Sequence, residues 1–388
     1  MGDVATKSQA WAVEVEDTEG VYKAPTSAAS YVQVQRDGSE ISKSKETVER
    51  NIFTGSLGKV SPRTGMFTAG GTIAAEWKAA MTQGEAPELD KLLKAAFGGK
   101  RSLAAEVALA SGSTTEKLKV ADASLFSFGD TVLVKVPGAH HVSPIVGVDL
   151  EDDELTLLVP LAEAPAEGVM IGKFTTYHVA ESGHDSLSVT RYFEKAVRQY
   201  IVGAKVSSMA LGNFSVSGVP SLTFGLSGLD FDSNLHTQAH TPTYSEQKPP
   251  IILGACVFMD GQRIDINELS LNLENAIGFK TSTCAPNGRK ASRVTERTFT
   301  GTIDPYAAND SVANFTKFKT NTPFSLFALA SLPGAAGEKA SVVAIYMPNC
   351  LATEMSDADA EGLMKESISF SADRGSAGTI DECFMTFI

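Results

Sequence analysis

The chain has 388 residues, of which 43% are hydrophobic and 20% are charged, enough for two or three domains that each bury a core. Its 33 basic and 46 acidic residues give a net charge of −13, which disfavours binding to nucleic acid or anionic lipid. The longest strongly apolar run, 251–259, is too short to cross a bilayer, and the residues after Met1 carry no secretory signal pattern. Four widely spaced cysteines without a C-x-x-C pair indicate reduced thiols.

The first predicted elements are an N-terminal arm and a long β-hairpin. Residues 1–36 are expected to form the arm, with polar and apolar residues alternating over 11–16. Strand-like patterns over 39–57 and 67–77 flank a polar turn at 58–65 that contains Gly and Pro. This order predicts a hairpin with a mobile tip.

A short helix is predicted to follow the hairpin. Pro87 can occupy its first position, and Gly98 is expected to end it. Four residues at helical spacing form one apolar face that we expect to pack against a sheet: Leu89, Leu92, Leu93 and Ala96.

An extra block, residues 99–185, interrupts the first half of the chain. Its short apolar runs are separated by Gly, Pro and Asp turns, which predicts a small independent β-barrel or sandwich. The strand pattern of the first half resumes over 186–232. Residues 233–250, with Pro242, Pro249 and Pro250, are predicted to form a linker.

The second half repeats the order of the first. The segment 67–73 corresponds to 299–303, and 222–226 corresponds to 368–372. A second hairpin is predicted over 269–290, followed by a helix capped near 309–311. The apolar face of that helix, expected to pack on the sheet, consists of Val312, Phe315 and Phe318.

The predicted fold class is therefore mainly β (α+β), with two tandem sandwich domains, each with a flanking helix and a long hairpin. The first domain comprises 37–98 and 186–232, and the second comprises 251–388. Such a tandem duplication indicates quasi-symmetry, and hence assembly rather than catalysis.

Both predicted hairpin tips are basic, although the chain is acidic. Lys59 and Arg63 lie in the first tip, and Arg289 and Lys290 lie in the second. One hypothesis is that these four cations dock onto an acidic partner surface. The alternative is that they are ordinary solvent-exposed charges on loop tips.

No residue pattern predicts chemistry. The glycine-rich segment 98–102 lacks the upstream Gly of a phosphate loop, and His236 and His240 have no further metal ligands nearby. The acidic run 357–362 lacks the spacing of a calcium loop and is expected to be a solvated loop. We therefore expect no catalytic residues, no metal and no cofactor, and a protein that is not an enzyme.

Three segments, 11–21, 84–98 and 367–373, are similar to tail tube proteins of long-tailed bacteriophages. The resemblance implies a small β-sandwich with a helix and a long hairpin, which joins into rings whose inner strands form a closed barrel. Two such units in one chain resemble members that form trimeric rings with pseudo-six-fold symmetry. The block 99–185 departs from the simpler pattern and would decorate the exterior.

The resemblance also implies a function and partners. Stacked rings would form the tail tube, an acidic conduit through which double-stranded DNA passes without specific binding. The further partners implied are tail terminator, tape measure and tail-tip proteins, in a virion tail assembled in the bacterial cytoplasm and without membrane contact. The duplicated form favours a non-contractile tail.

Two other functions remain open from the residues alone. One is a virion surface or tail-tip adhesion protein that binds host glycan through block 99–185. Glycan sites usually present exposed Trp or Tyr, whereas this block has no Trp and only Tyr177. The other, a tail-tip hydrolase, needs a catalytic acid pair or triad that the sequence does not show.

Overall fold

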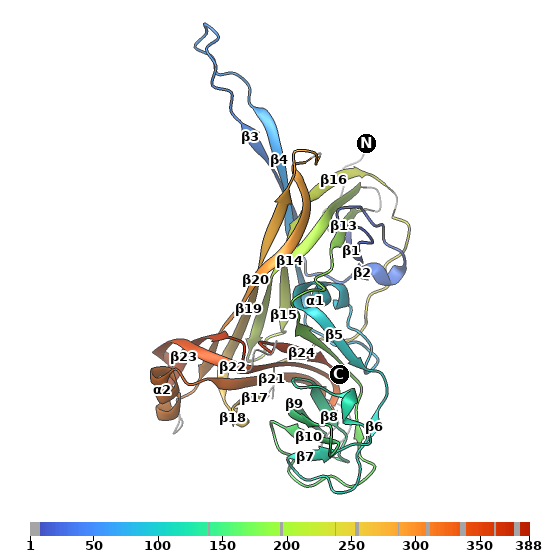
Figure 1. Cartoon of the computed structure of the whole chain (residues 1–388), viewed down its shortest axis with the longest axis vertical. Coiled ribbons are helices and arrows are strands. Elements are labelled where there is room, and N and C mark those ends of the chain that lie inside the picture. Colours follow the sequence, from blue (N-terminus) through green and yellow to red (C-terminus); the bar gives the residue numbers. More distant parts are fainter. Residues whose placement is uncertain are drawn as a thin grey trace.

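A computed structural model describes residues 8–388 apart from 139, 195–196, 237, 253–255, 286, 308–310, 334–338, 361 and 376–380. The strands form one 18-stranded sheet and one six-stranded sheet, and two α-helices lie in the described part of the chain (Figure 1). The predicted mainly β fold class is confirmed.

The first half of the chain contributes eight strands to the large sheet. They are β1 (Gln9–Val15), β2 (Tyr31–Val32), β3 (Glu40–Val48), β4 (Arg63–Glu76), β13 (Leu187–Phe193), β14 (Val197–Ser215), β15 (Ser221–Gly228) and β16 (Asp230–Leu235). β1 pairs with β2 and β13, β14 pairs with β13, β15 and β16, and β4 lies between β15 and β3.

Residues expected in an N-terminal arm therefore belong partly to this sheet. Trp11 in β1 is 1% exposed and pairs with Arg191 in β13. A strand partner about 180 residues away along the chain cannot be read from the local pattern. The predicted linker differs less: β16 extends to Leu235, and the described residues of 238–250 lie outside helices and strands.

The second half repeats this pairing pattern. Its strands are β17 (Cys256–Met259), β18 (Gln262–Ile264), β19 (Ile266–Thr281), β20 (Arg289–Pro305), β21 (Phe324–Pro333), β22 (Lys339–Ala360), β23 (Leu363–Ala372) and β24 (Phe384–Phe387). β17 pairs with β18 and β21, β22 pairs with β21, β23 and β24, and β20 lies between β23 and β19. Each pair has an antiparallel counterpart in the first half. We call the two sets of strands the first and second repeat.

The two repeats form one continuous structure. β14 of the first repeat pairs with β19 of the second, and β12 (Phe174–Val179) joins β5 (Gly98–Leu103) to β24. One hydrophobic core draws side chains from both repeats, including Trp77 and Phe224 from the first and Leu273 and Phe370 from the second.

The smaller sheet lies at one end of the molecule (Figure 1). Its strands, in the order β6-β11-β8-β9-β10-β7, are β6 (Val107–Ala108), β7 (Lys117–Lys119), β8 (Thr131–Val134), β9 (His141–Asp149), β10 (Glu154–Leu157) and β11 (Met170–Ile171). It thus spans a narrower range than the predicted block 99–185, because β5 and β12 pair in the large sheet.

The core of the smaller sheet is continuous with the second repeat, although the sequence predicted an independent unit. The Phe128 ring lies 6.2 Å from the Tyr346 ring and 5.8 Å from the Phe384 ring, between centroids. Asp130 is fully buried, and burial raises the pKa of its carboxyl, while the Arg101 guanidinium 2.7 Å away opposes that shift. The inserted sheet is therefore tied to the large sheet by aromatic packing and an ion pair.

The two helices differ sharply. α1 (Asp90–Phe97) ends as predicted at Gly98, which adopts φ 87° and closes the helix through its N–H to the Lys94 carbonyl. The predicted face is buried, whereas α2 (Ser311–Thr320) has no buried residue among those described. The prediction that its apolar stripe packs on the sheet is wrong for Val312 and Phe315, which are 74% and 54% exposed. Its predicted cap at Asn309 and Asp310 lies outside the described residues.

Candidate assembly surfaces

The junction between the repeats is a built strand interface. β14 and β19 pair antiparallel, with Met209 opposite Leu273 and Leu211 opposite Leu271. All four side chains are at most 3% exposed, so this register places apolar residues of both strands in the core.

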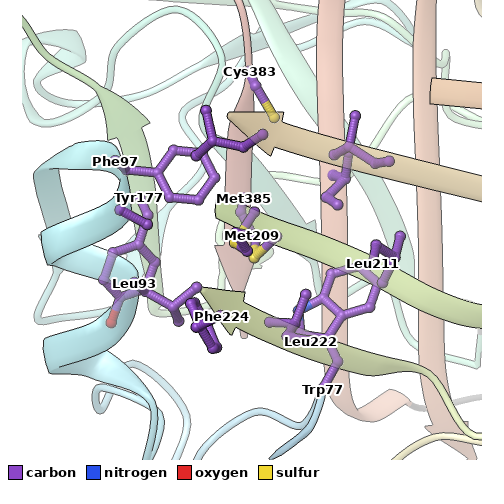
Figure 2. Packing of buried hydrophobic residues seen from close by; sticks show 14 of the residues in the cluster. Trp77, Leu93, Phe97, Tyr177, Met209, Leu211, Leu222, Phe224, Cys383 and Met385 are labelled. Atoms are coloured by element: carbon purple, nitrogen blue, oxygen red, sulfur yellow. The ribbon is translucent and has the colours of Figure 1, made fainter. Parts of the chain in front are cut away.

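α1 covers this junction on the core side. Leu93 and Phe97 point from the helix toward Met209 and Phe224 (Figure 2). The Phe97 ring also lies 6.2 Å from the Phe299 ring of the second repeat. The helix of the first repeat is thus buried partly by the second.

A buried amide adds a polar tie at the same place. Asn275 on β19 is 3% exposed, and its Nδ2 donates to the Ala96 carbonyl of α1 and the Val206 carbonyl of β14, both at 3.1 Å. Replacing this side chain with an apolar one would leave two buried carbonyls without this donor.

Charged side chains hold the segment that follows the inserted block, at Ala180 and Glu181, to the second repeat. Arg297 on β20 lies 3.0 Å from Glu382 and donates to the Ala180 carbonyl at 3.0 Å. The Arg297 guanidinium also holds the pKa of the Glu181 carboxyl below its usual value, and Arg374 acts in the same direction.

Within the large sheet, the layer β3-β4-β15-β14-β19-β20-β23-β22 ends at two edges that are open in the described residues. β3 pairs with β4 on one side, and residues 351–360 of β22 pair with β23 on one side, with no further strand pairing for either. In the repeat pattern, β3 is the counterpart of β19 and β22 that of β14. The two open edges are therefore the counterparts of the two strands that pair at the internal junction.

The sheet face opposite the core is rich in hydroxyl groups. Strand pairing places these residues on it: Ser42, Ser44, Thr68, Thr72, Ser208, Thr223, Ser227, Ser270, Thr298, Thr300, Thr302, Ser367, Ser369 and Ser371. A shallow groove over β14, β19, β20, β22 and β23 is lined by several of them. We call this surface the hydroxyl face.

Carboxylates accompany the hydroxyl groups on this face. Glu40 pairs with Thr72, Glu274 with Thr298, and Glu354 with Ser369. Lys205, three residues before Ser208 on β14, directs its ammonium group away from this face, since its Nζ donates to the His184 carbonyl at 2.6 Å. The sequence analysis did not identify these acids, although Ser and Thr alternating with apolar residues over 298–303 and 367–372 marked the face.

The first hairpin tip projects away from the rest of the molecule (Figure 1). Residues 49–62 join β3 to β4 and carry the exposed apolar side chains Ile52, Phe53 and Leu57. Lys59 forms an exposed ion pair with Glu49 at 2.6 Å, and Arg63 is exposed at the start of β4. This tip combines cations with apolar groups.

The second hairpin tip instead packs against its own chain. The Arg289 guanidinium carbon lies 4.1 Å from the centre of the Phe279 ring, and Asn287 donates to the Leu229 carbonyl at 2.6 Å. Lys290 is exposed. The structure therefore does not bring the four predicted docking cations into one cluster.

Several expected sites can be placed as well. Residues 357–360 of the acidic run extend β22 rather than forming a loop, because they pair with β23. Tyr177 is buried and its hydroxyl donates to Asp90 at 2.5 Å, so it offers no exposed ring. Within the described ranges, no three His, Cys, Asp or Glu side chains group to hold a metal, and no helix is long and apolar enough to cross a membrane.

A sheet with two complementary bare edges is typical of subunits whose sheets are completed by further strands. A family model described as phage tail tube protein matches residues 7–372. The chain belongs to this family of structural proteins of the virion tail. No curated protein matches the sequence.

Proposed function

We propose that copies of this chain join edge to edge into rings, and that the rings stack into the tail tube that conducts double-stranded DNA. The observation that carries the proposal is the internal junction. Two strands that pair within the chain, β14 and β19, have as counterparts the two strands left open, β22 and β3. The same pairing between chains would extend this layer of the sheet and leave it without a bare edge in a closed ring.

The repeat also predicts the register of that contact. The bulge in β14 after Val206, opposite Leu226, matches the bulge in β22 after Ala352, opposite Phe370. Three residues further along, Met355 is therefore the counterpart of Met209, which faces Leu273 at the internal junction.

The counterpart of Leu273 follows from the hairpins. Leu271 pairs with Gly301, and Ile41 pairs with Gly71. Gly301 in turn pairs with Phe370, and Gly71 with Leu226, the two residues opposite the matched bulges. Ile41 thus takes the place of Leu271 and Lys43 that of Leu273, so we expect Met355 to face Lys43 of the next chain. Met355 is half-buried against the existing core, and Lys43 is exposed.

Ring size follows from the resemblance. Three chains with two repeats each would give six repeats per ring. The inserted sheet would then lie outside the tube, because it packs away from the hydroxyl face. Terminator, tape measure and tail-tip proteins would complete the tail.

The hydroxyl face would line the lumen. Duplex DNA carries a negative charge about every 1.7 Å along its axis, so cations on the wall would hold it. Hydroxyl groups hydrate the wall without charge, and Glu40, Glu274 and Glu354 repel phosphates within a screening length of about 8 Å. Such a wall suits passage without specific binding.

Contact between rings would use the projecting hairpin. Lys59 and Arg63 would dock on the acidic surface of the neighbouring ring, together with Arg289 and Lys290 at the second tip. Double charge reversals test the two tips separately. K59E/R63E should block ring stacking, and R289E/K290E should weaken stacking while also loosening the second tip. Normal tubes from both variants would exclude docking through these cations.

Electron microscopy of the concentrated protein tests the proposal. Hollow striated tubes whose top views show three chains are expected, whereas a chain that stays monomeric even with a tail-tip initiator would overturn it. An oxidised M355C/K43C variant should form cross-linked oligomers, and M355C/T47C should not. Tubes without matched cross-links would refute only the register.

A further inference from the structure

The exposed helix α2 has a surface that its own chain does not cover. Val312 and Phe315 are 74% and 54% exposed, and the nearby β22–β23 hairpin end exposes Leu363 and Met364. The two elements are neighbours, since the Ala307 amide donates to the Met364 carbonyl at 3.0 Å and Asn314 donates to Glu366 at 3.4 Å. Figure 1 shows α2 beside β22 and β23 at the margin of the sheet.

This arrangement is unusual for a short helix. Helices below about 12 residues are marginal in water, and most gain their stability from an apolar face packed on other elements. α2 has 10 residues and none is buried among those described. Its described ties are polar, such as the ion pair between Lys317 and Asp260.

The counterpart α1 shows what covers a helix at this place in the repeat. α1 follows β4 as α2 follows β20, and each helix is ion-paired to an acid at or just past the first strand of its repeat: Lys91 to Glu14, and Lys317 to Asp260. Yet Phe97 of α1 packs on Phe299, which belongs to the following repeat. Part of the cover of α1 is therefore supplied by the repeat that comes next.

In the proposed ring, the repeat that comes next after α2 belongs to another chain. We propose that α2 is a clasp between subunits, in which Val312 and Phe315 are buried on the core side of β3 and β4 of the next chain, beside its Ile41. This inference rests on the proposed ring. It adds that closure buries a helix in addition to pairing two strand edges.

Cysteine labelling tests the clasp directly. In F315C, maleimide modification followed by peptide mass spectrometry should be fast in the monomer and at least ten-fold slower in assembled tubes. V312C provides the same readout should F315C fold poorly. The matched control is L150C, in a turn of the inserted sheet where the native leucine is 66% exposed, and its labelling should not slow.

A second measurement separates packing from proximity. V312D/F315D should leave monomer circular dichroism and melting unchanged but raise the critical concentration for assembly at least ten-fold. Equal labelling of F315C and V312C in monomer and tube, or normal assembly of the aspartate variant, would overturn the clasp. If the unmodified chain forms no tubes, the proposed function itself fails.

Discussion

The two repeats share one strand pattern but differ in what surrounds their last strands and their helices. In the first repeat, β14 has a neighbour on both sides along 208–211 and α1 is buried. In the second, residues 351–360 of β22 keep an open side and α2 is exposed. The difference teaches that burial here depends partly on a neighbouring repeat, which the second repeat supplies for the first.

The largest expected effect on stability comes from replacing one phenylalanine in each helix with alanine. F97A should lower the free energy of unfolding of the unassembled chain by about 3–5 kcal/mol, because Phe97 is fully buried. F315A should change it by less than about 0.5 kcal/mol, as expected for an exposed position. Urea denaturation monitored by circular dichroism measures both. Equal losses would show that α2 is already packed in the monomer.

The same contrast shows how far the sequence could go. Leu92, Leu93 and Gly98 specified α1 and its end, since helical spacing and a C-cap glycine are local signals. The spacing of Val312 and Phe315 predicted a helix equally well. The prediction that these side chains pack on the sheet was wrong, because the local sequence does not specify which surface a helix packs against. Whether a face is buried depends on long-range partners that a pattern does not name.

The sheet itself was predicted unevenly for a related reason. Alternation located the first hairpin, whose strands the structure places at 40–48 and 63–76. It did not show that β1 pairs with β13, nor that Glu40, Glu274 and Glu354 share one face. Both depend on the order of strands across the sheet, which joins segments far apart in the sequence.

A smaller effect should come from the acids that anchor the two helices. Glu14 is buried and accepts hydrogen bonds from Lys91 at 2.9 Å, the Thr26 amide at 3.1 Å and the Ser30 hydroxyl. Burial alone would raise the pKa of its carboxyl, but these donors hold it below its usual value. E14Q should therefore lower the free energy of unfolding at pH 7 by about 1–3 kcal/mol.

The stability difference between E14Q and the unaltered chain should depend on pH in one direction. A carboxyl whose pKa is lower in the folded state stabilises the fold above its unfolded pKa, and that contribution is lost as the pH falls through the folded pKa. The gap between E14Q and the unaltered chain should thus close as the pH falls below about 4. D260N, at the half-exposed counterpart near α2, should cost at most about 1 kcal/mol. A constant gap for E14Q down to pH 2 would contradict this account.

The smallest effect on stability is expected on the hydroxyl face, which both repeats share. Thr300 is exposed there, so T300K should change the free energy of unfolding by less than about 0.5 kcal/mol and should still permit tubes. It would, however, place a cation from each chain against the phosphates of passing DNA. Virions that carry T300K should therefore eject DNA more slowly than those carrying the neutral control T300Q.

Varying the salt concentration distinguishes an electrostatic delay of ejection from one caused by the size of the lysine side chain. Screening shortens from about 8 Å at physiological ionic strength to about 3 Å at 1 M, so the delay of T300K relative to T300Q should shrink as salt rises. A delay independent of salt would indicate a steric obstruction. Equal ejection rates at low salt would mean that the hydroxyl face does not line the path of the DNA, and the lumen would then have to be sought on another surface of the ring.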